Sequence, residues 1–113
     1  MAPDALFSVA WPVVMMEGRD VVLFAERGDL QATLEPWIAY DEAVEFYDAL
    51  GRRLRVFAAH EGVDVMLGED LSRVQIDQVV QRLRESLNET ERSAHVPVDA
   101  LRMFIAGLEA TPP

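Results

Sequence analysis

The densest group of side chains that could do chemistry is a run of carboxylates in the middle of the chain. It consists of Asp41, Glu42, Glu45 and Asp48. Carboxylate oxygens are the ligands that hard cations such as Mg²⁺ and Ca²⁺ prefer. If the run forms a strand, however, Glu45 and Asp48 point to opposite faces, because side chains alternate along a strand. The pattern therefore predicts a solvated acidic rim and no metal site.

The two histidines, His60 and His95, are the other candidates for acid–base or metal chemistry. His60 is next to Glu61 and near Asp64, an arrangement that a general base or a metal ligand could use. A histidine in a polar turn is more often simply solvated, and the same holds for His95 in its polar connector. Neither residue predicts a catalytic site.

Familiar catalytic motifs do not occur in this sequence. Its four serines lie outside any G-x-S-x-G elbow, and phosphate-binding glycine loops, H-E-x-x-H and calcium-loop spacings are missing. The chain has no cysteine, which excludes disulfides and thiolate metal sites. We therefore expect a protein without catalysis and without a cofactor, and keep a small enzyme with an unfamiliar active site as an alternative.

Composition bounds the size and the partners of the protein. The chain has 113 residues, 50% of them hydrophobic, and a formal net charge of −10. A single domain over residues 1–113 is expected, because this length suits one hydrophobic core. Residues 1–50 hold ten acids and only two arginines, and this excess disfavours nucleic acid, whose phosphates need basic clusters.

Nothing in the sequence predicts a membrane segment or export. No apolar run approaches the roughly 18 residues that a membrane helix needs. No basic residue precedes Arg19, whereas a signal peptide begins with a basic region. Together with the lack of cysteine, these features predict a cytoplasmic protein.

The elements that must position these side chains centre on residues 43–68, which we expect to form a three-stranded antiparallel meander. Its first turn runs from Asp48 to Gly51, with aspartate and glycine where a type I turn favours them. A bulged loop with Gly51 in the left-handed conformation places Tyr47 opposite Arg53. The same register predicts three further pairs: Phe46 with Leu54, Val44 with Val56, and Glu45 with Arg55.

The second turn allows two interpretations. A two-residue loop at residues 61–62 keeps the apolar residues of 63–67 on the same face as those of the first strand. A three-residue loop beginning at His60 would turn them to the opposite face, because a slip of one residue reverses every side chain. The shared apolar face favours the two-residue loop, which pairs Val56 with Leu67.

A helix through residues 41–57 is the alternative to the first hairpin. Val44, Tyr47, Leu50 and Leu54 also fit a helical spacing. The glycine at position 51 and the β-branched and aromatic residues around it favour strands instead.

The residues before the meander predict two strands and a short helix. Residues 7–16 and 20–25 are nearly continuous apolar runs, as in strands that are central or covered on both faces. Pro12 places its end of the first strand at an edge or a bulge. Asp29 should cap a short helix carrying Leu30 and Leu34, which ends before Pro36, and residues 37–40 should then be extended.

Two helices are expected after the meander. Ser72 and Gln75 have the spacing of a capping box at the start of the first helix, whose apolar stripe runs from Ile76 to Leu87. A polar connector over residues 88–95 leads to a last helix, with Pro97 in its first turn. The predicted fold is α+β: about five antiparallel strands, a short helix after the second strand and two C-terminal helices, with the helices packed on one sheet face.

The first turn also carries a resemblance. Asp48, Gly51, Arg52 and Leu54 form a D-x-x-G-R-x-L pattern that resembles a hairpin of small proteins common in high-GC bacteria. The resemblance covers mainly the meander and implies a turn. It implies no activity.

Two surfaces of the meander are candidates for binding a protein. The acidic rim offers Asp41, Glu42 and Asp48. The second face of the strands mixes aromatic, arginine and methionine side chains, a composition typical of interface cores, unless helices cover it. The residues of that face are Tyr47, Arg53, Arg55, Phe57 and Met66, of which all but Arg55 are the candidate binding residues.

These features lead to a hypothesis of binding without catalysis. We expect an immunity or inhibitor protein whose acidic surface occludes a basic protein partner, such as a toxin or a nuclease. The alternative is a housekeeping homo-oligomer, for example a homodimer, whose copies are joined through the strand face or the last helix. In that case the acidity would serve solubility.

Overall fold

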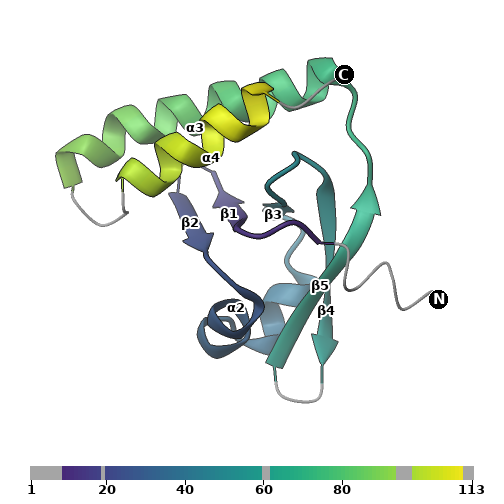
Figure 1. Ribbon diagram of the computed structural model, residues 1–113. Coiled ribbons are helices and arrows are strands. Elements are labelled where there is room, and N and C mark those ends of the chain that lie inside the picture. The colour runs from purple at the N-terminus through teal and green to yellow at the C-terminus, as the bar shows by residue number, and fades with distance from the viewer. Residues whose placement is uncertain (1–8, 19, 60–61, 94–97, 111–113) are drawn as a thin grey trace.

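One antiparallel sheet with helices on both of its faces makes up the structure (Figure 1). The computed structural model describes residues 9–18, 20–59, 62–93 and 98–110. Its strand order is β2-β1-β3-β4-β5, and every neighbouring pair is antiparallel. The elements are β1 (Val13–Glu17), β2 (Asp20–Phe24), α2 (Arg27–Thr33), η1 (Pro36–Tyr40), β3 (Val44–Tyr47), β4 (Arg53–Ala59), β5 (Gly62–Glu69), α3 (Arg73–Ser93) and α4 (Val98–Ala110). The expected α+β class is confirmed.

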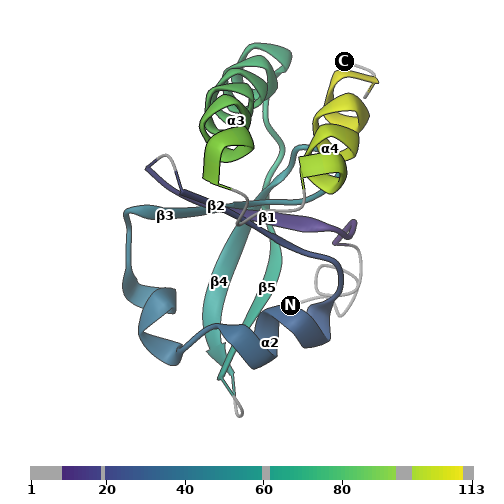
Figure 2. The ribbon, with the colours of Figure 1, turned by 90° about the vertical axis from the view of Figure 1, so that its left-hand side faces the viewer.

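Two hydrophobic cores lie on the two faces of this sheet. Figure 2 shows α3 and α4 on one side, and α2 with the β4–β5 hairpin extending to the other. In β1, Val14 and Met16 are buried against α3 and α4, while Val13 is buried in the core that contains α2 and η1. The prediction of helices on one face only is therefore wrong. Apolar side chains at consecutive positions of β1 need a cover on each side.

The first hairpin has the predicted register at its turn. Tyr47 is opposite Arg53, and the Gly51 amide donates to the Asp48 carbonyl at 3.0 Å. Gly51 has a φ of +81°, the left-handed conformation that the bulged loop requires. Between the described residues of β3 and β4 the ladder has this one pair, so none of the three further pairs that we expected is formed: Phe46 with Leu54, Val44 with Val56, and Glu45 with Arg55. The two strands separate beyond the turn, and η1 packs against β4.

The second hairpin has the predicted faces but a different register. Val56 lies opposite Val65, where Leu67 was expected, and Ala59 lies opposite Gly62. The shift is two residues along β5, so Val63 and Val65 still reach the core of Phe46. A shift of two preserves side-chain direction, and burial of the face therefore does not fix which pair forms. Residues 60–61 of the loop lie outside the described residues.

The N-terminal boundaries differ from the expectation in two places. β1 begins at Val13 rather than at residue 7, immediately after Pro12, whose nitrogen cannot donate to a ladder. Residues 7–8 lie outside the described part. α2 begins at Arg27 with Glu26 in the capping position, so Asp29 sits in the first turn and is not the N-cap.

Two segments that we expected to be non-helical are helical. Residues 37–40 belong to the 3₁₀ helix η1, which Pro36 opens, and proline is well suited to a first helical turn. α3 continues to Ser93 through most of the predicted polar connector. His95 and Pro97 lie outside the described residues.

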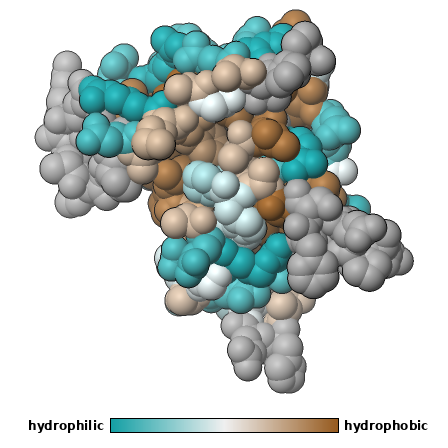
Figure 3. All heavy atoms as spheres, in the orientation of Figure 1, coloured by the Kyte–Doolittle hydropathy of each residue, from teal (hydrophilic) through white to brown (hydrophobic). Residues whose placement is uncertain are grey.

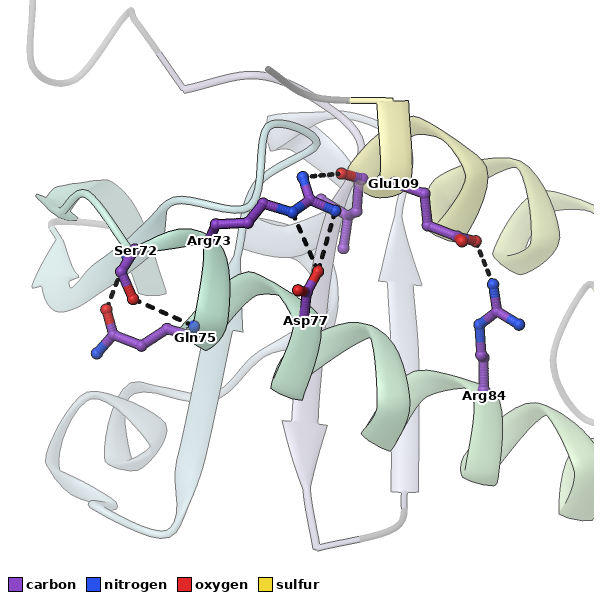
Figure 4. Close-up of polar contacts among 7 residues, drawn as sticks. Ser72, Arg73, Gln75, Asp77, Arg84 and Glu109 are labelled. Atoms are coloured by element: carbon purple, nitrogen blue, oxygen red, sulfur yellow. Dashed lines mark hydrogen bonds and ion pairs between the residues drawn. The ribbon is translucent and has the colours of Figure 1, made fainter. Parts of the chain in front are cut away.

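The start of α3 follows its sequence signature. The backbone N–H of Gln75 donates to the Ser72 hydroxyl at 3.2 Å, and the backbone N–H of Ser72 donates to the side-chain oxygen of Gln75 at 2.8 Å (Figure 4). Each side chain thus satisfies a backbone N–H that has no partner within the helix. The predicted capping box is confirmed, and Ile76 follows it in the buried stripe.

Polar contacts join α3 to α4 above the apolar core. Arg73 bonds Asp77 within α3 and donates to the Leu108 carbonyl of α4 at 3.4 Å (Figure 4). About three turns further along the same side of α3, Arg84 forms an ion pair with Glu109. These pairs are partly exposed, so they fix the orientation of α3 relative to α4 more than they stabilise the fold.

The turn glycine supplies a test of the fold. We expect Gly51→Ala to lower the free energy of unfolding by about 1–3 kcal/mol, because of its positive φ. The new Cβ would also lie 3.3 Å from side-chain atoms of Ile76 and Leu108. Gly107→Ala is the matched control, because its Cβ would meet no atom within 4 Å in a helix interior, and a gain of about 0.5–1 kcal/mol is expected. Denaturant unfolding measures the free energy of unfolding of both variants. Equal gains in stability would contradict the left-handed conformation of Gly51 in the turn.

Candidate functional site

The structure separates the predicted binding residues into four places. Asp48 lies in the β3–β4 turn, and Tyr47 and Arg53 lie beneath α3. Asp41 and Glu42 lie at the corner between η1 and β3. Phe57 and Met66 lie on the β4–β5 hairpin. The residues therefore do not form one continuous surface.

Asp48 is fully buried, and its side chain stabilises the turn between β3 and β4. Its carboxylate accepts backbone N–H groups from Leu50 at 3.0 Å, Arg52 at 2.9 Å and Ala10 at 3.2 Å. It also forms an ion pair with the Arg52 guanidinium at 2.8 Å. The prediction that Asp48 belongs to an exposed acidic rim is wrong, because a residue with 0% exposure cannot meet a partner.

Tyr47 is also buried, in a polar cluster that the sequence did not reveal. Its hydroxyl donates to Glu45 at 2.9 Å, and Arg82 of α3 donates to the other Glu45 oxygen at 2.6 Å. Arg53 lies 3.6 Å from the same carboxylate. Glu45 thus takes Arg82 and Arg53 as partners in place of Arg55. Glu45 and Arg82 are 37 positions apart, so no local pattern could pair them.

The charges of this cluster are fixed rather than poised for proton transfer. The hydrogen bond from Arg82 lowers the pKa of Glu45 below its usual value, and the same bond raises the pKa of Arg82. Burial, followed by the bond to Glu45, raises the pKa of Tyr47 to about 12. A general acid or base works best with a pKa near the operating pH, which these groups lack. The cluster therefore joins the sheet to α3.

Asp41 and Glu42 adjoin two exposed aromatic side chains of η1. Trp37 is 55% exposed and Tyr40 is 79% exposed. The Trp37 indole donates to Glu35 at 2.8 Å, and Asp41 accepts the Ala43 amide at 3.0 Å. We call Glu35, Trp37, Tyr40, Asp41 and Glu42 the acidic–aromatic corner. The i, i+3 spacing of the aromatics after a proline was the signal that could have located it.

Phe57 and Met66 are half-buried on the β4–β5 hairpin. Phe57 lies opposite Asp64, which forms an ion pair with Arg27 of α2. The Arg27 guanidinium lies 5.4 Å from the centre of the Trp11 ring and donates to the Val65 carbonyl of edge strand β5. Part of this face is therefore occupied by contacts within the chain, and Phe57 and Met66 expose only part of their surface.

An apolar groove of about 330 Å³ lies beneath α4, and nothing in the sequence pointed to it. Figure 3 shows apolar side chains gathered below this helix. Met103 stands at the groove and is 76% exposed. The groove is lined by Ala100, Met103, Phe104 and Gly107 from α4, and by Pro12, Leu23, Ala25 and Ala49 from the sheet side.

Within residues 9–18, 20–59, 62–93 and 98–110, three or more His, Asp or Glu side chains do not meet in an arrangement that could hold a metal ion. His60, Glu61 and His95 fall outside the ranges and are not placed. None of the helices so described is long and apolar enough to cross a membrane.

No protein-family model, curated protein or solved structure matches the chain. The class that the structure defines is an α+β domain with a hydrophobic core on each face of its sheet.

Substitution of Asp48 tests whether this residue stabilises the turn between β3 and β4. Asp48→Ala should lower the free energy of unfolding by about 2–5 kcal/mol, because three backbone N–H donors and the Arg52 guanidinium lose a buried acceptor. Asp41→Ala removes an equal charge from the corner and should cost no more than about 1 kcal/mol. Denaturant unfolding of both variants measures the difference, and similar losses would contradict the role of Asp48 in the turn.

Tyr47 gives a test in alkaline solution. The Tyr40→Phe variant leaves Tyr47 as the only tyrosine, and ultraviolet titration should show its phenolate forming at about pH 12. Because folding raises this pKa above 10, the neutral hydroxyl stabilises the fold below pH 10, and that contribution is lost as the pH rises through about 12. Tyr47→Phe should lose less stability over this interval. A phenolate forming near pH 10 in the folded protein would contradict the cluster.

Proposed function

We propose that this protein is a small cytoplasmic binding protein without catalysis that occludes a basic protein partner, as an immunity or inhibitor protein does for a toxin or a nuclease. One observation carries the proposal: two large aromatic side chains are exposed among three carboxylates at the acidic–aromatic corner. Tryptophan and tyrosine are the residues on which interface binding energy most often concentrates. Carboxylates around them favour a positively charged partner.

The arrangement of charge over the molecule supports a basic partner. Most described arginines are held in ion pairs with carboxylates of the same chain, as between Arg52 and Asp48 or Arg82 and Glu45. The acids outnumber the arginines by two to one over the whole sequence. The field outside the protein is therefore negative, which attracts basic proteins and repels a second acidic copy.

A homo-oligomer is the second candidate function, because of the apolar groove beneath α4. Exposed Met103 and small residues such as Ala100 and Gly107 would let another helix approach closely there. This agrees with the expectation of an oligomer joined through the last helix. A stable dimer in solution, together with no captured partner, would favour this function over the first.

The proposal predicts association controlled by charge at the corner. Asp41→Arg with Glu42→Arg should slow association with the partner obtained by affinity capture from the native host, with a smaller effect on dissociation. The effect should fade as salt is raised, since the screening length is about 8 Å near physiological ionic strength. Binding kinetics across a salt series measures both rates.

The matched control places the same charge change elsewhere. Asp70→Arg with Glu85→Arg alters two exposed acids, one after β5 and one on α3. This variant should associate nearly as fast as the unchanged protein. An association rate that responds neither to salt nor to the corner substitutions would refute the proposal. Solubility would then be the role of the acidic residues.

A further inference from the structure

We infer that the acidic–aromatic corner is an arginine-binding site, at which Trp37 and Tyr40 stack on a guanidinium of the basic partner. The inference rests on the proposed function and names the side chain recognised. It starts from η1, a single 3₁₀ turn over residues 36–40. The turn is held in place by Ile38, which is buried in the core.

The geometry of a 3₁₀ helix brings the two aromatic side chains together. With three residues per turn, positions 37 and 40 lie on the same side, about 6 Å apart along the axis. Ile38 points to another side and into the core, which leaves both rings in solvent. Two rings at this spacing can contact one flat guanidinium.

The carboxylates complete the site. Glu35 accepts the Trp37 indole N–H and thereby places negative charge beside the ring. Glu42 is exposed two residues after the end of η1. Asp41 contributes less, because it borders a groove of about 270 Å³ whose other wall carries Arg53 and Arg55. An arginine of the partner would therefore meet the Trp37–Glu35 end.

The chain uses the same chemistry internally. Arg27 lies over the Trp11 ring and forms an ion pair with Asp64. An aromatic face and a carboxylate thus hold a guanidinium together in this fold. Arginine suits such a site better than lysine, because its group is planar and weakly hydrated. At the corner, among the described residues, Trp37 has no arginine of the same chain stacked on it.

The test titrates the isotopically labelled full chain with a short peptide of alternating arginine and glycine, followed by NMR. The chain has two tryptophans, so the indole N–H signal of Trp37 reports the site and that of Trp11 is an internal control. We expect the Trp37 signal to shift saturably while that of Trp11 stays in place. Affinity should fall about three- to tenfold for Tyr40→Ala, and by a similar factor when lysine replaces arginine in the peptide.

Two outcomes would overturn the inference. One is a Trp37 signal that does not move, and the other is equal affinity for arginine and lysine peptides together with an unaffected Tyr40→Ala. Met103→Ala truncates a similarly exposed side chain on α4 and should leave the affinity unchanged. Attraction by charge alone needs no stacking, so the proposed function survives either result. It fails separately, through the corner charge reversal described above.

Discussion

The buried carboxylate of Asp48 is the interaction on which the arrangement of this fold depends. It binds the turn between β3 and β4 and also the backbone of Ala10, which lies just ahead of the interior strand β1. The turn therefore meets β1 at one fixed place, and Gly51 comes to lie against Ile76 of α3 and Leu108 of α4. The turn that Asp48 holds thus brings the sheet against the helix layer. The same burial removes Asp48 from any surface that a partner could reach.

The second constraint is the burial of β1 on both faces. Val14 and Met16 require α3 and α4 on one side, and Val13 requires α2 and η1 on the other. This division also decides where polar groups can lie. Glu45 falls on the helix side, where Arg82 is available to pair with it. The helix η1 lies on the opposite side of the sheet, and its aromatic residues Trp37 and Tyr40 remain exposed to solvent.

Local signals in the sequence predicted most of the elements, because turns and caps depend on few neighbouring residues. The Gly51 turn, the capping box at Ser72 and the strand faces follow from such signals. The register of β5 does not, because a shift of two residues keeps the same side chains buried. The pairing of Glu45 with Arg82 joins distant segments, and its charges fit several partners equally well. For the candidate site, sequence located Asp41 and Glu42 but missed Trp37, since an extended segment was expected there.

The positions of the charges explain why the candidate site lies at η1 rather than on the strands. On the strands, Arg53 is drawn to Glu45, and Tyr47 is closed beneath α3. Those groups already satisfy one another, so a partner would have to break existing contacts to use them. At η1 the polar contacts are local: Glu35 holds the Trp37 ring and leaves more than half of it exposed. Binding there needs no rearrangement of the core, which favours association limited by encounter and therefore sensitive to charge.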